Sequence, residues 1–168
     1  MTGILLALSI IATAHPAPLS ALECVPGRYA GKTWSANEAL HGKEVTLVVT
    51  KQKDACNMRF KSPSAKTEEM WELAGNHLVQ RDLNEKGKEV SKYGATLEVR
   101  EGVEGYFIDC AADATKGCDG GADRRTYWRI ETKGKNIIYS VWGVDPAKAS
   151  DPKAAVRKRI EYTFTPAP

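Results

Sequence analysis

Hydrophobic residues recur at every second position through most of the chain from Gly27 onward. In KEVTLVVT (residues 43–50), Val45, Leu47 and Val49 fall on one face, and threonine and valine fall on the other. The same alternation returns in SKYGATLEV (91–99) and in KRIEYTFTP (158–166). A period of two places successive side chains on opposite faces of a strand. These segments therefore predict β-strands that bury one face.

Short polar turns separate the alternating segments, as at Ala74–Asn76 and at Lys133–Asn136. The pattern predicts nine or ten strands in one all-β domain, joined by connections too short for crossover helices. It favours a single antiparallel up-and-down β-barrel whose last strand, around Tyr162, pairs with the first. A β-sandwich remains the alternative. Short helical turns are expected in SANEALHG (35–42) and after Asp151.

The first expected strand, GRYAGKTW (27–34), resembles the opening strand of lipocalin-like barrels. The helical turn after it falls where those folds carry a lid loop. The resemblance implies a lipocalin-like or calycin-like barrel architecture. It covers about a dozen residues and assigns no functional residue.

The amino-terminal region has a different composition from the rest. An unbroken apolar run, Ile4–Ala14, is followed by small residues and prolines, and no charged side chain occurs before Glu23. Such a run is too short to span a bilayer and is typical of a secretory signal peptide. We expect residues 1–21 to be the signal, with cleavage after Ala14 or Ala21. Residues 22–168 then form a single domain that is secreted or periplasmic.

The chain contains four cysteines, and an exported protein meets an oxidising compartment. Their spacing does not match the paired short spacings of zinc sites. We predict the disulfides Cys24–Cys56 and Cys110–Cys118, although four cysteines allow three pairings.

Charge excludes some classes of partner. The 24 basic and 21 acidic residues are interspersed, with a formal net charge of +3. A nucleic-acid-binding protein concentrates its basic residues in a patch or stripe, which is absent from this sequence. After the signal, no apolar segment is long enough to predict a transmembrane helix.

Sequence evidence for catalysis, metals or cofactors is weak. Apart from His15, only His41 and His77 are histidines, and the sequence has no Gly-x-Ser-x-Gly motif, no His-Glu-x-x-His motif and no glycine-rich phosphate loop. The segment IDCAADATKGCDGGADRR (108–125) contains Asp113, Asp119 and Asp123, but their spacing does not fit a calcium-binding EF-hand loop. We expect no enzyme activity, no cofactor and no metal site, and interpret this segment as a disulfide-bonded surface turn. A weak cation site there and an active site near His41 or His77 are the alternatives.

Aromatic and aliphatic residues in the alternating segments suggest a ligand site inside the barrel. We predict that an exported binding module holds a small apolar or amphipathic ligand there. A protein-binding role, such as inhibition of a secreted hydrolase through loops 35–42 and 111–125, is the alternative. The candidate ligand contacts are Trp71, Tyr93, Leu97, Trp128, Ile130 and Phe164.

Overall fold

A computed structural model describes residues 22–61, 67–108, 125–148 and 150–168. The predicted signal, residues 1–21, lies outside this part of the chain. In the described residues, ten strands follow one another with two short 3₁₀ helices: β1 Gly27–Ser35, η1 Glu38–Leu40, β2 Glu44–Gln52, β3 Ala55–Lys61, β4 Glu68–Ala74, β5 His77–Leu83, β6 Glu89–Arg100, β7 Val103–Ile108, β8 Tyr127–Lys133, β9 Asn136–Gly143, η3 Pro146–Lys148 and β10 Arg157–Pro166.

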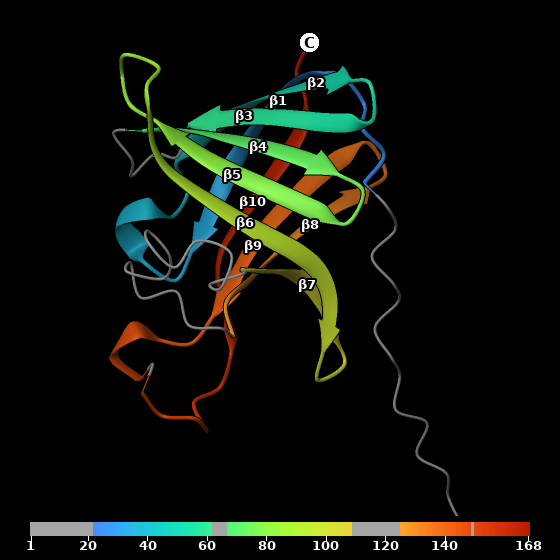
Figure 1. The fold of residues 1–168 in the computed structure, drawn as a ribbon. Coiled ribbons are helices and arrows are strands. Elements are labelled where there is room, and N and C mark those ends of the chain that lie inside the picture. The colour runs from blue at the N-terminus through green and yellow to red at the C-terminus, as the bar shows by residue number, and fades with distance from the viewer. Residues whose placement is uncertain (1–21, 62–66, 109–124, 149) are drawn as a thin grey trace, which may run out of the picture.

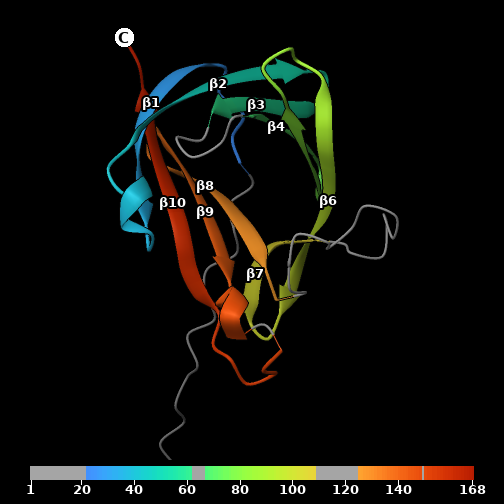
Figure 2. The same ribbon diagram turned by 90° about the vertical axis from the view of Figure 1, so that its left-hand side faces the viewer.

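The strands form a closed antiparallel up-and-down barrel, as the alternation predicts (Figures 1 and 2). Each strand pairs with its neighbours in sequence, and closure comes from β1 and β10, which pair from Tyr29 opposite Pro166 to Ser35 opposite Ile160. This long pairing excludes the β-sandwich. The shortest pairing among the described residues is that of β7 with β8, where Tyr106 lies opposite Trp128 and Phe107 opposite Tyr127.

The two ends of the barrel differ in their connections. At one end, which we call the hairpin end, β2–β3, β4–β5, β6–β7 and β8–β9 are each joined by two residues in the described chain. The first residue of each turn has a positive φ, at Lys53, Gly75, Glu101 and Gly134. Such turns match the right-handed twist of paired strands. The longer connections from β1 to β2 and from β5 to β6 lie at the opposite end, the loop end, on the left of Figure 1.

Six aromatic side chains fill the middle of the barrel. Trp71 lies at the centre, with its ring 3.9 Å from that of Tyr139 and 5.1 Å from that of Phe60, measured between centroids. Both approaches are edge-to-face, a favoured geometry for aromatic pairs. Trp71 is also 6.0 Å from Trp128, and Tyr162 and Phe164 continue the cluster along β10. The sequence places these rings inward because each occupies a buried position of an alternating strand.

A disulfide between Cys24 and Cys56 ties the segment before β1 to β3, as predicted. The other predicted pair, Cys110–Cys118, lies outside the described residues, as do Asp113, Asp119 and Asp123. We call residues Leu22–Pro26 the N-terminal strap. Leu22 and Cys24 pack against the core, and the phenol of Tyr29 donates a hydrogen bond to the carbonyl of Val25 over 2.9 Å.

Of the two expected helical turns, one forms and one does not. In 35–42, η1 is a single 3₁₀ turn capped by the side chain of Asn37, which accepts a hydrogen bond from the Ala39 amide. The prediction of a helix after Asp151 is wrong. That region is a turn in which three carbonyls, from Asp151, Pro152 and Ala154, accept hydrogen bonds from Arg125. The Asp151 carbonyl also accepts from the Ala154 amide over 3.1 Å, a single i to i+3 bond that closes a turn.

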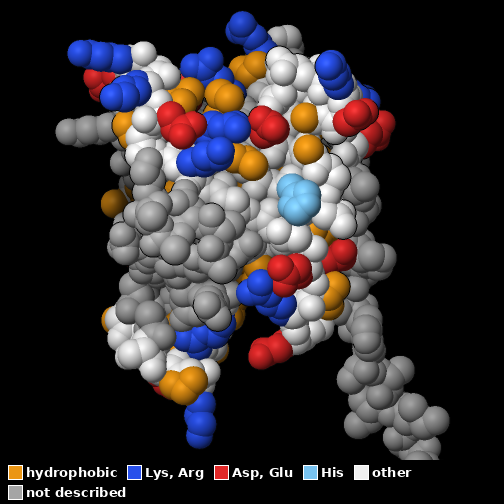
Figure 3. Space-filling model, in the orientation of Figure 1, with side chains coloured by type: hydrophobic (Ala, Val, Ile, Leu, Met, Phe, Trp, Pro, Cys, Tyr) orange, Lys and Arg blue, Asp and Glu red, His pale blue; other side chains and the backbone are white. Residues whose placement is uncertain are grey.

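The outer surface of the barrel carries both signs of charge. On the face over β3 to β6, basic and acidic side chains alternate with small hydrophobic groups (Figure 3). One contact there joins three strands, because Arg81 lies 3.2 Å from Glu72 and 3.4 Å from Glu89. No helix among the described residues has the length and apolarity needed to cross a bilayer.

Candidate functional site

All six candidate ligand contacts belong to the barrel interior. Trp71, Trp128, Ile130 and Phe164 are buried members of the core cluster. Tyr93 and Leu97 are partly buried and pack against that cluster. The structure therefore gives the first four a packing role, and Leu97 also borders a cavity. Ligand contact by these residues stays a prediction.

The cavity beside Leu97 opens at the hairpin end and has a volume of about 710 Å³. We call it the hairpin-end pocket. Its floor consists of side chains that point inward from β4, β6 and β7, namely Leu73, Leu97 and Tyr106, together with Leu22 of the strap. Its remaining lining is Glu23, Cys24, Lys51, Lys53, Asp54, Ala55, Cys56, Gly75 and Asn76.

The rim of this pocket is polar and carries both charges. Lys51 and Lys53 are exposed on the β2–β3 hairpin, with Asp54 beside them and Glu23 on the strap. Burial raises the pKa of the Tyr106 phenol, and the nearby Glu104 raises it further. The phenol therefore stays neutral at physiological pH and can both donate and accept a hydrogen bond. An apolar floor with a polar rim suits a small amphipathic molecule.

Local structure fixes two sides of the pocket. The β4–β5 turn is hydrogen-bonded to β6, because the Leu97 amide donates to the carbonyl of Asn76 over 2.8 Å. The strap is fixed by the disulfide, whose Cα atoms lie 5.6 Å apart. These covalent and hydrogen-bonded contacts hold the pocket open without a ligand.

A second polar feature lies inside the barrel, toward the loop end. Glu69 of β4 lies opposite Asp82 of β5. The Gln80 amide donates to Asp82 over 3.1 Å and reaches Glu69 at 3.5 Å, and the Ser91 hydroxyl donates to Asp82. Among the described residues, no Lys or Arg forms an ion pair with either carboxylate.

This environment changes the acidity of Glu69. Burial is the largest cause and the charge of Asp82 is the second, and together they raise the pKa of Glu69 to about 7. The indole of Trp71 acts in the opposite direction. The indole N–H is buried and makes no hydrogen bond of good geometry. Burial is also the largest cause that raises the pKa of Tyr139, and the nearby charges of Glu69 and Asp82 raise it further, so its phenol is neutral.

The sequence alone does not reveal the acidic pair, because alternation relates only residues of one strand, such as the neighbours Glu68 and Glu69. Those two do point to opposite faces: Glu68 pairs with Arg59 outside the barrel, and Glu69 points inward. The partner of Glu69 comes from the next strand. Leu78, Gln80 and Asp82 occupy alternate positions of β5 and therefore share one face. Along that face the apolar Leu78 is followed by two polar residues, and this was the available sequence signal for polar groups inside the barrel.

The remaining candidates for chemistry are dispersed. His41 and His77 are both exposed, one after η1 and one at the start of β5. Within the described residues, no group of three or more His, Cys, Asp or Glu side chains is arranged to hold a metal ion. Most of loop 111–125 lies outside the described residues.

Comparison of the chain with protein-family models, with curated proteins and with solved structures finds no match in any of the three. The function is therefore argued from the geometry of the pocket.

Proposed function

We propose that this protein is an exported binding module that holds a small amphipathic molecule in the hairpin-end pocket, without chemistry of its own. The observation that carries the proposal is the pocket of about 710 Å³ with an apolar floor of barrel side chains. Pockets of about 300 to 1,000 Å³ with a few polar groups are typical of small-molecule sites. The oxidised Cys24–Cys56 pair and the predicted signal support export.

The apolar floor and the polar rim of the pocket together determine how the ligand is oriented. Its apolar part lies on Leu73, Leu97 and the Tyr106 ring of the floor, and its polar group lies at the rim near Lys53. Because Glu23 and Asp54 balance Lys51 and Lys53, the rim favours no single sign of charge. Affinity then comes mainly from the apolar area removed from water.

The test is native mass spectrometry of gently purified protein, followed by titration with the fluorescent amphiphile 1-anilinonaphthalene-8-sulfonate. Leu97→Trp fills the floor of the pocket. The matched control is Val48→Trp, the same kind of substitution on the outer face of β2 at a position that is 40% exposed. We expect an added mass or saturable dye binding in the wild type and in V48W, and at least a tenfold loss in L97W.

The thermal unfolding temperature of both variants checks that they fold. A wild-type protein that carries no added mass and binds no dye contradicts the proposal. So does a folded L97W variant that binds as tightly as V48W. A second variant, Leu22→Trp, fills the same floor from the strap and keeps the test decisive if L97W is unfolded.

A further inference from the structure

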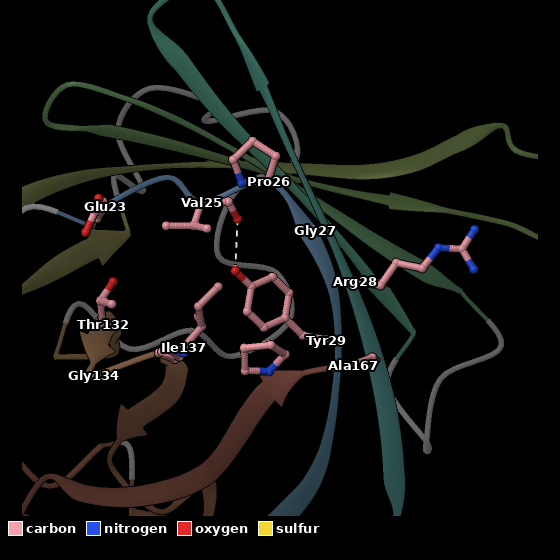
Figure 4. Close-up of a pocket in the computed structure, with 12 residues that line it drawn as sticks. Glu23, Val25, Pro26, Gly27, Arg28, Tyr29, Thr132, Gly134, Ile137 and Ala167 are labelled. Atoms are coloured by element: carbon pink, nitrogen blue, oxygen red, sulfur yellow. Dashed lines mark hydrogen bonds between the residues drawn. The ribbon is translucent and has the colours of Figure 1, made fainter.

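A second cavity, of about 450 Å³, lies at the hairpin end beside the strap (Figure 4). Glu23 lines both cavities, so the strap lies between them. The walls of the second cavity come from three parts of the chain: the strap with the start of β1, the β8–β9 hairpin, and the residues at the end of β10. We call it the strap cavity.

The walls of the strap cavity are mainly apolar and well fixed. Tyr29 and Ile137 are 4% and 3% exposed, so both belong to the rigid core. The Tyr29 ring is held by the hydrogen bond from its phenol to the Val25 carbonyl. Pro166 adds a third wall, and the amide of the next residue, Ala167, donates to the carbonyl of Arg28 over 2.8 Å. This cavity is therefore formed before any ligand arrives.

One polar group in the lining lacks a partner. The hydroxyl oxygen of Thr132 is buried and makes no hydrogen bond among the described residues. Figure 4 places Thr132 beside Ile137, across the cavity from Val25. Buried hydroxyl groups in native proteins are nearly always hydrogen-bonded. The Thr132 side chain as a whole is partly exposed although its hydroxyl oxygen is not, so rotation about the Cα–Cβ bond would bring the unpaired hydroxyl to the cavity, where a bound molecule supplies the missing partner.

Charge at the strap cavity does not select an ion. Arg28 points away from the cavity in Figure 4. The remaining charged residues of the lining, Glu23 and Lys135, are of opposite sign. An ionic ligand would lose its hydration among apolar walls and gain no net opposite charge, so an uncharged molecule is favoured.

We propose that the strap cavity is a separate binding site for a compact uncharged molecule, consisting of a ring or branched alkyl group with one hydroxyl or carbonyl group. The ring packs on Tyr29 and Ile137, and the polar group forms a hydrogen bond with the Thr132 hydroxyl. A hydroxyl ligand can donate or accept in that bond, and a carbonyl ligand accepts from it. This site does not depend on the hairpin-end pocket, with which it shares only Glu23.

The test uses four probes with one ring system: indan-1-ol, indane, 1-aminoindane and indane-1-carboxylate. Binding to the purified protein is followed by amide chemical-shift changes in NMR titrations, with dissociation constants expected in the millimolar range for ligands of this size. We expect indan-1-ol to bind about two to ten times more tightly than indane, which corresponds to the net contribution of one neutral hydrogen bond. Both charged probes should bind more weakly than indan-1-ol.

Two variants assign the binding to this cavity. Thr132→Val keeps the shape of the side chain and removes the hydroxyl, so indan-1-ol should bind no better than indane. Val25→Trp fills the cavity from a position that is 45% exposed, and it should abolish binding of both. The matched control is Val48→Trp, at a position of 40% exposure on β2, which should bind as the wild type does.

The proposal is overturned if indan-1-ol and indane bind equally well to the wild type, since Thr132 then bonds to water. It is also overturned if T132V keeps the preference for indan-1-ol, or if V25W binds as tightly as V48W. The L97W variant separates this site from the hairpin-end pocket: it should lose dye binding and keep indan-1-ol binding. A negative result for one proposed site therefore does not count against the other.

Discussion

Replacing Glu69 by glutamine should remove a pH dependence from the stability of the barrel. Burial and the neighbouring Asp82 raise the pKa of Glu69 from 4.5 to about 7. Between these values the carboxyl is protonated in the folded protein and ionised in the unfolded chain. The folded state therefore binds more protons, and its stability falls as the pH rises from about 4.5 to about 7. Above about pH 7 the loss of stability due to Glu69 is complete and no longer changes with pH.

The size of the effect follows from the shift. One pKa unit corresponds to about 1.4 kcal/mol, so the full shift corresponds to about 3 kcal/mol. Glu69 keeps some contact with solvent, which screens the charge, and we expect about 2 kcal/mol. Glutamine has nearly the same shape and cannot ionise. E69Q should therefore match the wild type near pH 5 and exceed it by about 2 kcal/mol at pH 8, or about 6 °C in Tm for a domain of this size.

The assay is urea unfolding at several pH values from 5 to 8, with the difference between variant and wild type as the measured quantity. That difference removes the contributions of the titrating groups that do not interact with Glu69. Glu72→Gln is the matched control, because Glu72 lies on the same strand and faces outward to Arg81. Its effect should be below about 1 kcal/mol and vary little with pH. A difference for E69Q that stays constant from pH 5 to pH 8 would refute the reasoning.

The remaining predictions concern the strap and the closure of the barrel. Cys24→Ser with Cys56→Ser removes a crosslink that spans 32 residues, and should lower the free energy of unfolding by about 3.5 kcal/mol; a loss below about 1 kcal/mol would show that the strap adds little constraint. Gly31→Ala should destabilise by about 2–3 kcal/mol, because its Cβ would collide with the Thr163 carbonyl across the β1–β10 pairing. Gly94→Ala, which meets nothing within 4 Å, is the control, and equal denaturation midpoints for the two variants would contradict this account of closure.

The interior of the barrel depends on which strands become neighbours. A period of two assigns each side chain to a face, so the inward positions of Trp71, Trp128 and Phe164 follow from the sequence. It does not assign the partner strand. The meeting of Glu69 with Asp82 depends on the β4–β5 register, which puts two carboxylates of separate strands side by side inside the barrel.

Local chemistry in the sequence determined the strands, their inward faces, the tight turns at Gly75 and Gly134 and the existence of one all-β domain. These features depend on residues close together along the chain, where alternation and turn propensity act directly. Only the tertiary structure decided between barrel and sandwich, through the pairing of β1 with β10. It also decided that the aromatic residues pack as core, and that cavities form where the strap meets hairpins distant in sequence. Cavities depend on how well separate segments fill the space between them, and no local pattern of residues specifies that fit.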